Sequence, residues 1–136
     1  MGKVAEFQTS TGHTKTPNRL RVVVYDNLKD VRKWGRWAGG EAYGKDTYGV
    51  TNKQTVYEAD KEKPSRIEAI IRLDKEHCAT GLVAHEVAHA AVYFFTKDGN
   101  CLHKGSSIDK EELFCYIYGD LFHQITKKLY KKGIWS

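Results

Sequence analysis

The sequence lacks the features that mark secreted and membrane proteins. Its three cysteines, Cys78, Cys101 and Cys115, are odd in number and show no framework spacing, which argues against a disulfide-stabilised extracellular domain. No apolar run is long enough to span a bilayer, and the first residues lack the apolar core of a secretory signal. We therefore expect a cytoplasmic protein that does not enter a membrane.

The sequence also has no evident internal repeat and no low-complexity tract. Its 136 residues fall within the usual range for one compact fold, and its 40% hydrophobic content supports a folded core. We expect a single domain over residues 1–136, of which residues 1–18 are flexible.

The clearest chemical signal is the stretch His85-Glu86-Val87-Ala88-His89. The two histidines are four residues apart, so in a helix their imidazoles lie on one face and can bind a single metal ion. Glu86 is rotated around the helix, where its carboxylate can reach a water on the metal instead of the metal itself. This pattern predicts two zinc ligands and a general base.

The residues around this motif are almost all apolar from Thr80 to Phe95, which is typical of a central core helix. Burying imidazoles and a carboxylate without partners costs on the order of several kcal/mol. A bound metal ion is therefore the simplest explanation of the motif. The alternative is a core helix whose histidines are satisfied by backbone carbonyl groups.

A catalytic zinc site usually has three protein ligands, so one more ligand must come from outside the motif. The metzincin continuation requires glycine and histidine at positions where this chain has Val92 and Phe95, which excludes that class. The strongest acidic candidates are Glu111 and Glu112, which open a second predicted helix that continues to about Tyr130.

The two glutamates lie on different sides of that helix. Glu112 shares a side with the small residues Cys115 and Gly119, where we expect the motif helix to approach closely. Glu111 aligns instead with Phe114 and Tyr118. We therefore predict Glu112 as the third ligand, with Glu111 as the alternative. Both glutamates could also be structural, because carboxylates are favoured in the first turn of any helix.

Taken together, these residues resemble the gluzincin zinc metallopeptidases, and most of all the compact bacterial and phage-encoded zincins of the ImmA/IrrE and SprT-like group. The resemblance covers roughly residues 66–124. It implies a minimal α+β zincin-like domain, with a small N-terminal sheet, a central motif helix and a long C-terminal helix. It also implies zinc as cofactor, peptide-bond hydrolysis, Glu86 as base, and His85, His89 and Glu112 as ligands. The chain departs from the thermolysin-type pattern, because Glu111 stands where that pattern has asparagine.

The segments before the motif follow strand and helix patterns. A β-branched run at Arg19–Tyr25 predicts a strand, and Leu28 to about Trp37 predicts a short helix. Residues 43–57 favour a hairpin around Asn52-Lys53. Apolar and charged residues alternate from Arg66 to Leu73, which predicts a half-buried strand whose free edge could hold an extended peptide.

The expected partner is therefore a protein or peptide substrate in an unfolded or loop segment. A nucleic acid is the weaker alternative, because the net charge is +5 and two groups of basic residues could form a binding surface. These groups are Lys127, Lys128, Lys131 and Lys132, and the aromatic-basic cluster of Arg32, Lys33, Trp34, Arg36 and Trp37. The competing function is a catalytically silent binding module. His103 or a tyrosine could stabilise the oxyanion of the reaction.

Overall fold

The computed structural model describes residues 2–39, 48–57, 59, 64–100 and 108–136. Within these residues the elements are β1 (Lys3–Thr9), β2 (Asn18–Tyr25), α1 (Leu28–Gly39), β3 (Gly49–Val56), β4 (Arg66–Asp74), a 3-10 turn (Lys75–His77), α2 (Thr80–Lys97) and α3 (Ile108–Lys131). The α+β class, with a small sheet, the motif helix and a long C-terminal helix, is confirmed. None of the helices in the described part of the chain is long and apolar enough to cross a membrane.

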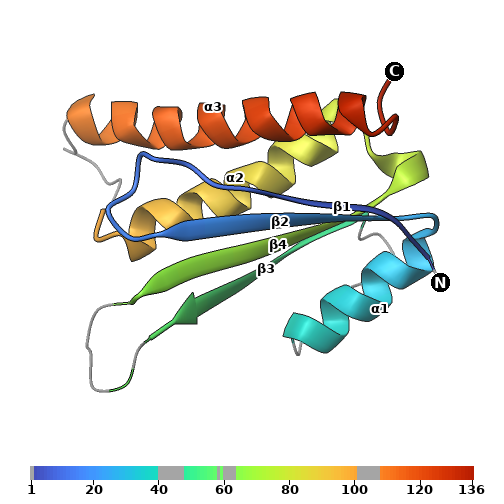
Figure 1. Ribbon diagram of the computed structural model, residues 1–136, viewed down its shortest axis with the longest axis horizontal. Helices are drawn as coiled ribbons and strands as arrows, with labels where there is room; N and C mark the ends of the chain where they lie inside the picture. Colours follow the sequence, from blue (N-terminus) through green and yellow to red (C-terminus); the bar gives the residue numbers. More distant parts are fainter. Residues whose placement is uncertain (1, 40–47, 58, 60–63, 101–107) are drawn as a thin grey trace.

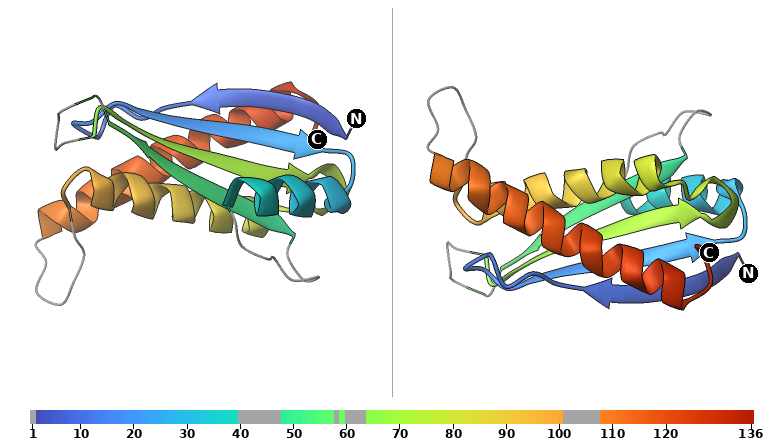
Figure 2. Two further views of the ribbon diagram at one scale, coloured as in Figure 1. Left: turned by 90° about the horizontal axis from the view of Figure 1, so that it is seen from below. Right: turned by 90° about the horizontal axis from the view of Figure 1, so that it is seen from above.

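The four strands form one sheet in the order β1-β2-β4-β3. β2 and β4 pair in parallel, whereas β1 and β3 pair antiparallel to their neighbours. Helices α2 and α3 cover one face of the sheet, and α1 packs on the other face (Figures 1 and 2). The motif helix therefore lies directly against the sheet, with α3 above it in Figure 1.

The main core lies between the sheet and the two long helices. Alternate residues of β2 and β4 point into it, because successive side chains of a strand face opposite sides of the sheet. On the helices, buried residues recur at helical spacing. The fully buried members of this core with the largest side chains include Leu20, Val22, Val24, Ile67, Ile71, Leu73, Phe94, Phe95, Ile117, Leu121, Ile125 and Leu129. Each such side chain stabilises the fold by about 1.5–3 kcal/mol through burial.

A smaller core holds α1 against the opposite face of the sheet. The helix begins after Asn27, whose side-chain oxygen accepts a hydrogen bond of 2.8 Å from the backbone of Asp30, as an N-cap residue does. Val31 is fully buried in this cluster beside Val50 of β3. A Cβ at Gly35 would lie 2.9 Å from both γ-methyls of Val50. The glycine therefore allows α1 to pack closely on β3.

Several sequence predictions of local structure are confirmed. The strands predicted at 19–25 and 66–73 are β2 and β4, the helix predicted at 28–37 is the start of α1, and the C-terminal helix is α3. In β4, the alternating residues Ile67, Ala69, Ile71 and Leu73 are buried as expected.

The predicted hairpin around Asn52-Lys53 is wrong. Both residues lie in the middle of β3, which pairs with β4 along its whole length, from Gly49 opposite Leu73 to Val56 opposite Arg66. The continuous pairing leaves no turn at this point. As a result β4 is an interior strand without a free edge, and β3 is the edge strand beside the motif helix.

The expectation of a flexible N-terminal segment is wrong for β1. Residues Lys3–Thr9 pair with β2, and Phe7 and Thr9 are buried. The segment that follows is tied to the end of α2, where the Asp98 carboxylate accepts hydrogen bonds of 2.9 and 2.8 Å from the backbone N–H groups of Lys15 and Thr16. Strand pairing and these bonds order the start of the chain.

Candidate functional site

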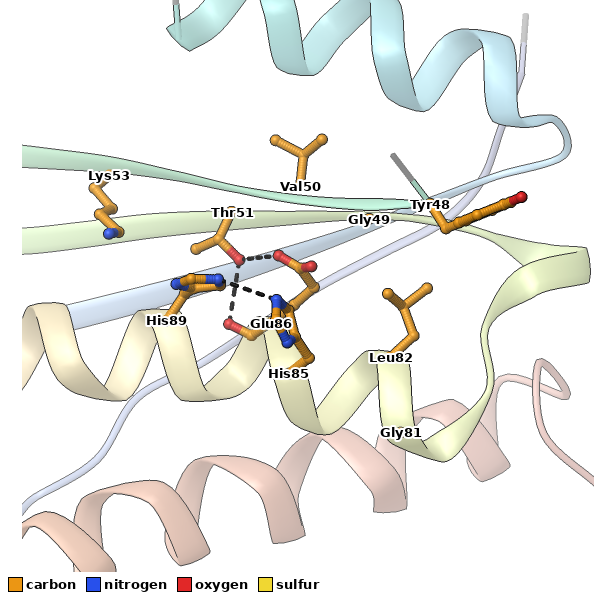
Figure 3. Close-up of a pocket in the computed structure, with 10 residues that line it drawn as sticks. All are labelled: Tyr48, Gly49, Val50, Thr51, Lys53, Gly81, Leu82, His85, Glu86 and His89. Atoms are coloured by element: carbon orange, nitrogen blue, oxygen red, sulfur yellow. Dashed lines mark hydrogen bonds between the residues drawn. The ribbon is translucent and has the colours of Figure 1, made fainter. Parts of the chain in front are cut away.

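A pocket of about 630 Å³ lies between α2 and the edge strand β3. Figure 3 shows that His85, Glu86 and His89 enter it from α2, while Thr51 and Lys53 enter it from β3. Its remaining lining residues are Tyr48, Gly49, Val50, Gly81 and Leu82. The volume lies in the range of ordinary small-ligand sites. All three residues of the predicted motif therefore share one cavity.

The ring nitrogens of the two histidines lie close together. The Nε2 atoms of His85 and His89 are 3.2 Å apart, and the rings meet edge to face at 79°. Two nitrogens that each bind zinc at 2.0–2.1 Å in tetrahedral geometry are about 3.3 Å apart. The observed separation fits this value, and a ring nitrogen of one histidine can alternatively donate a hydrogen bond to the other.

The burial expected for the histidines is not found. His85 and His89 are both exposed, because they project from the side of α2 toward the open pocket. Desolvation of the imidazoles is therefore no argument for a metal. The alternative of core histidines satisfied by backbone carbonyls is also wrong, since these residues lie at the surface of the helix. The case for a metal depends instead on the separation of the two Nε2 atoms.

Glu86 is the buried member of the motif, with 5% of its surface exposed. The Thr51 hydroxyl lies 2.6 Å from Oε1 of Glu86 and 3.1 Å from the Glu86 backbone oxygen, and shares its one hydrogen between them. No described residue donates a hydrogen bond to the second carboxylate oxygen, Oε2. Glu86 lines the pocket, and Thr51 holds one of its carboxylate oxygens.

The edge strand β3 also packs closely against Glu86 at Gly49. A Cβ at this position would lie 3.1 Å from Cγ and 3.2 Å from Oε2 of Glu86. Gly49 and Thr51, two residues apart on one face of the strand, together set the position of the carboxylate. Neither residue is predicted from the sequence, because the expected hairpin covers this segment. The strand signal in this segment is its β-branched residues, Val50, Thr51, Thr55 and Val56.

The packing argument for Glu112 is wrong. Cys115 and Gly119, the small residues expected to face α2, are both exposed, and so is Glu112. A Cβ at Gly119 would meet no atom within 4 Å. The strip faces solvent because α3 turns its large apolar residues inward, and small residues do not compete with them for burial.

The flank of α3 that contacts α2 is the one aligned with Glu111. Phe114 packs against Phe95, with ring centroids 5.6 Å apart. The Tyr118 hydroxyl donates a hydrogen bond of 2.8 Å to the backbone oxygen of Ala84, next to His85. Burial raises the pKa of Tyr118 above its ordinary value, so its hydroxyl remains a donor. Glu111 lies on the side of α3 that carries these contacts, although Glu111 is itself exposed.

The structure brings together only part of the predicted site. His85, Glu86 and His89 share a pocket, but the described residues contain no group of three His, Cys, Asp or Glu side chains arranged to hold a metal ion. Neither Glu111 nor Glu112 thus completes the site in this arrangement. His103, the candidate for oxyanion stabilisation, lies outside the described residues.

The two groups of residues proposed as a nucleic-acid surface come from different helices, α1 and α3. α1 carries Lys33 and Trp34, with the Lys33 ammonium 5.4 Å from the Trp34 ring centroid. α3 lies on the opposite face of the sheet (Figure 1). Of its lysines, Lys128 donates a hydrogen bond of 2.5 Å to the Gln8 backbone, so it has a structural partner. The described side chains of the two groups therefore lie on opposite faces of the sheet (Figure 1).

The pocket brings together side chains of the kinds that take part in hydrolysis. Two imidazole nitrogens 3.2 Å apart and a carboxylate line a single pocket, and groups of these kinds are components of metal-assisted hydrolysis. The gluzincin-like motif stays a resemblance in sequence: no protein-family model, curated protein or solved structure matches this chain.

Proposed function

We propose that this protein is a zinc-dependent metallopeptidase. The observation that carries the proposal is the 3.2 Å separation of the His85 and His89 Nε2 atoms in the pocket that also contains Glu86. The residue types support zinc, which binds imidazole nitrogen and carboxylate oxygen. The same proposal assigns the protein to the cytoplasm, where the free thiols of Cys78 and Cys115 would stay reduced.

Three residues would hold the metal. His85 and His89 supply two ligands, and a glutamate at the start of α3 supplies the third. The sequence spacing favours Glu112 for this role, whereas the contacts of α3 with α2 favour Glu111. We propose Glu111 as the first choice and keep Glu112 as its alternative. In either case the first turn of α3 must come nearer to the histidines than in the present arrangement.

Glu86 is the proposed general base. Bound zinc would polarise the scissile carbonyl and acidify water in the pocket. The Thr51 hydroxyl holds Oε1 of Glu86, so Oε2 is the atom that takes the proton as water attacks the carbonyl carbon. Glu86 then passes this proton to the leaving amine nitrogen, and the peptide bond is broken. The carboxylate returns to its starting state.

The edge strand β3 is the proposed platform for the substrate. It pairs with β4 on one side only, and its residues Gly49, Thr51 and Lys53 line the pocket. An extended peptide can add to such an edge through backbone hydrogen bonds. The protein would then act on unfolded or loop segments, since a folded domain rarely presents a free extended strand.

The test is the substitution Glu86→Gln. Glutamine keeps the shape of the side chain and can still accept the hydrogen bond from Thr51, but it cannot act as a base. We expect folded, zinc-loaded protein whose cleavage of unfolded casein is lower by on the order of 100 to 10,000-fold. Wild-type protein at equal zinc content is the matched control.

The catalytically silent binding module is the second candidate. It is favoured by one observation: the described residues assemble no three-donor metal cluster, so the Thr51 bond to Glu86 could serve packing alone. If zinc-loaded wild type cleaved neither casein nor itself, and Glu86→Gln gave the same cellular phenotype as wild type, this candidate would replace the metallopeptidase.

A further inference from the structure

One cation in the pocket has no part in the proposed hydrolysis. Lys53 follows Thr51 by two residues on β3, so both side chains point to the same face of the sheet, roughly 7 Å apart along the strand. Lys53 lines the pocket together with His89. In Figure 3 it occupies the His89 end of the pocket, while Tyr48 and Leu82 occupy the other end.

The side chain of Lys53 is positioned by an aromatic ring. Its ammonium lies 5.9 Å from the ring centroid of Tyr93 on α2, which is a cation–π distance. Tyr93 packs against the main core, and its hydroxyl is hydrogen-bonded to the Thr55 hydroxyl of β3. Contacts with the main core and with β3 therefore hold the Tyr93 ring in place beside the Lys53 ammonium.

Lys53 forms no ion pair with the described residues that line the pocket. Glu86 is the one carboxylate among the described lining residues, and it is buried and accepts its hydrogen bond from Thr51. No ion pair joins Lys53 to a carboxylate in the part of the chain that the structure describes. A zinc ion at the histidines would add two further positive charges. Among the described residues Lys53 thus has no carboxylate partner, and an anionic ligand in the pocket would supply one.

We propose that Lys53 binds a carboxylate of the peptide that occupies this pocket, either an acidic side chain or the C-terminal carboxylate. Lys53 lies two residues along the edge strand from Thr51, which contacts Glu86. This position makes Lys53 a residue that selects which peptide bond is cleaved. The role in cleavage rests on the proposed function, whereas binding of a carboxylate at Lys53 does not.

The binding claim is tested by NMR titration of the metal-free protein. N-acetyl-glutamate α-amide presents a side-chain carboxylate and N-acetyl-alanine presents a terminal one, while N-acetyl-glutamine α-amide is the uncharged control. We expect saturable shifts of the Lys53 and Thr51 signals with at least one carboxylate, and the stronger binder identifies its source. Lys53→Gln should weaken binding by roughly tenfold, the loss expected for one charge-assisted hydrogen bond.

Lys127→Gln, a change at an exposed lysine of α3, is the matched control and should leave binding unchanged. The proposal is overturned if neither carboxylate shifts Lys53, if the glutamine amide shifts it equally, or if Lys53→Gln binds like wild type. This result is independent of zinc and of catalysis, so it separates the failure of this proposal from the failure of the proposed function.

The specificity claim is tested by sequencing the products of a peptide library digested with the zinc-loaded protein. We expect Asp, Glu or a chain end within a few residues of the cut, no such preference with Lys53→Gln, and a preference for Lys or Arg with Lys53→Glu. If all three proteins cleaved the library with the same sequence preference, Lys53 would be refuted as a specificity residue. The proposed metallopeptidase function would still stand. No cleavage by any of them would instead refute the proposed function and with it the specificity role.

Discussion

The hydrogen bond between Thr51 and Glu86 leads to a quantitative prediction. Thr51→Val keeps the β-branched shape of the side chain but removes the donor 2.6 Å from Oε1. Glu86 is 5% exposed, so its carboxylate would lose a partner that water replaces only in part. Hydrogen bonds to charged groups contribute about 1.5–3 kcal/mol. We expect Thr51→Val to lower the free energy of unfolding by about 2 kcal/mol.

This loss converts to a measurable change in melting temperature. For 136 residues, an unfolding entropy of about 2.1 cal/mol/K per residue makes 2 kcal/mol equivalent to a decrease of roughly 7 °C. Thermal unfolding followed by circular dichroism measures it. Thr51→Ser retains the hydroxyl and should recover most of the loss. In a Glu86→Gln background, Thr51→Val should cost only about 1 kcal/mol, because the bond is then neutral. Equal melting temperatures for wild type, Thr51→Val and Thr51→Ser would refute the reasoning.

Two further predictions concern the third ligand and the N-terminal strand. Glu111→Gln should weaken zinc binding by roughly tenfold or more in a competition titration, and Glu112→Gln should change it little; the opposite order would return the ligand to Glu112. The pKa of Glu6 is lowered by hydrogen bonds from Lys3 and Arg21, so its stabilising effect is present above the unfolded pKa and is lost as the pH falls through the lower folded pKa. Glu6→Gln should thus reduce stability at about pH 7 by less than about 1 kcal/mol and have no effect at about pH 2; an equal loss of stability at both pH values would contradict this assignment.

The parts of the fold that sequence predicts best are those with a strong hydrophobic pattern. The alternation in β4 and the helical spacing of Ile117, Leu121 and Ile125 follow directly from burial on one side of an element. The strand β3 was missed because it is an edge strand with few apolar residues. Its Thr and Gly residues face the pocket instead of a core, so their pattern resembles that of a turn.

The candidate site was predictable in its motif but not in its surroundings. Four-residue spacing alone places His85 and His89 side by side, and the structure confirms that they face one another. The proposed choice between Glu111 and Glu112 rests on the packing of α3 on α2, which depends on the rotation of one helix about its axis. Small residues suggested the wrong rotation, since large apolar residues elsewhere on α3 contribute more to burial.

The measurement that tests the central claim most directly is the zinc content of the purified protein, determined by mass spectrometry of the metal after expression with added zinc and extensive dialysis. We predict about one zinc per chain for wild type and none for His85→Ala or His89→Ala. Both histidines are exposed, so these variants should stay folded, which circular dichroism verifies. A wild-type protein without stoichiometric zinc, or folded variants that keep it, would contradict a metal site at these histidines.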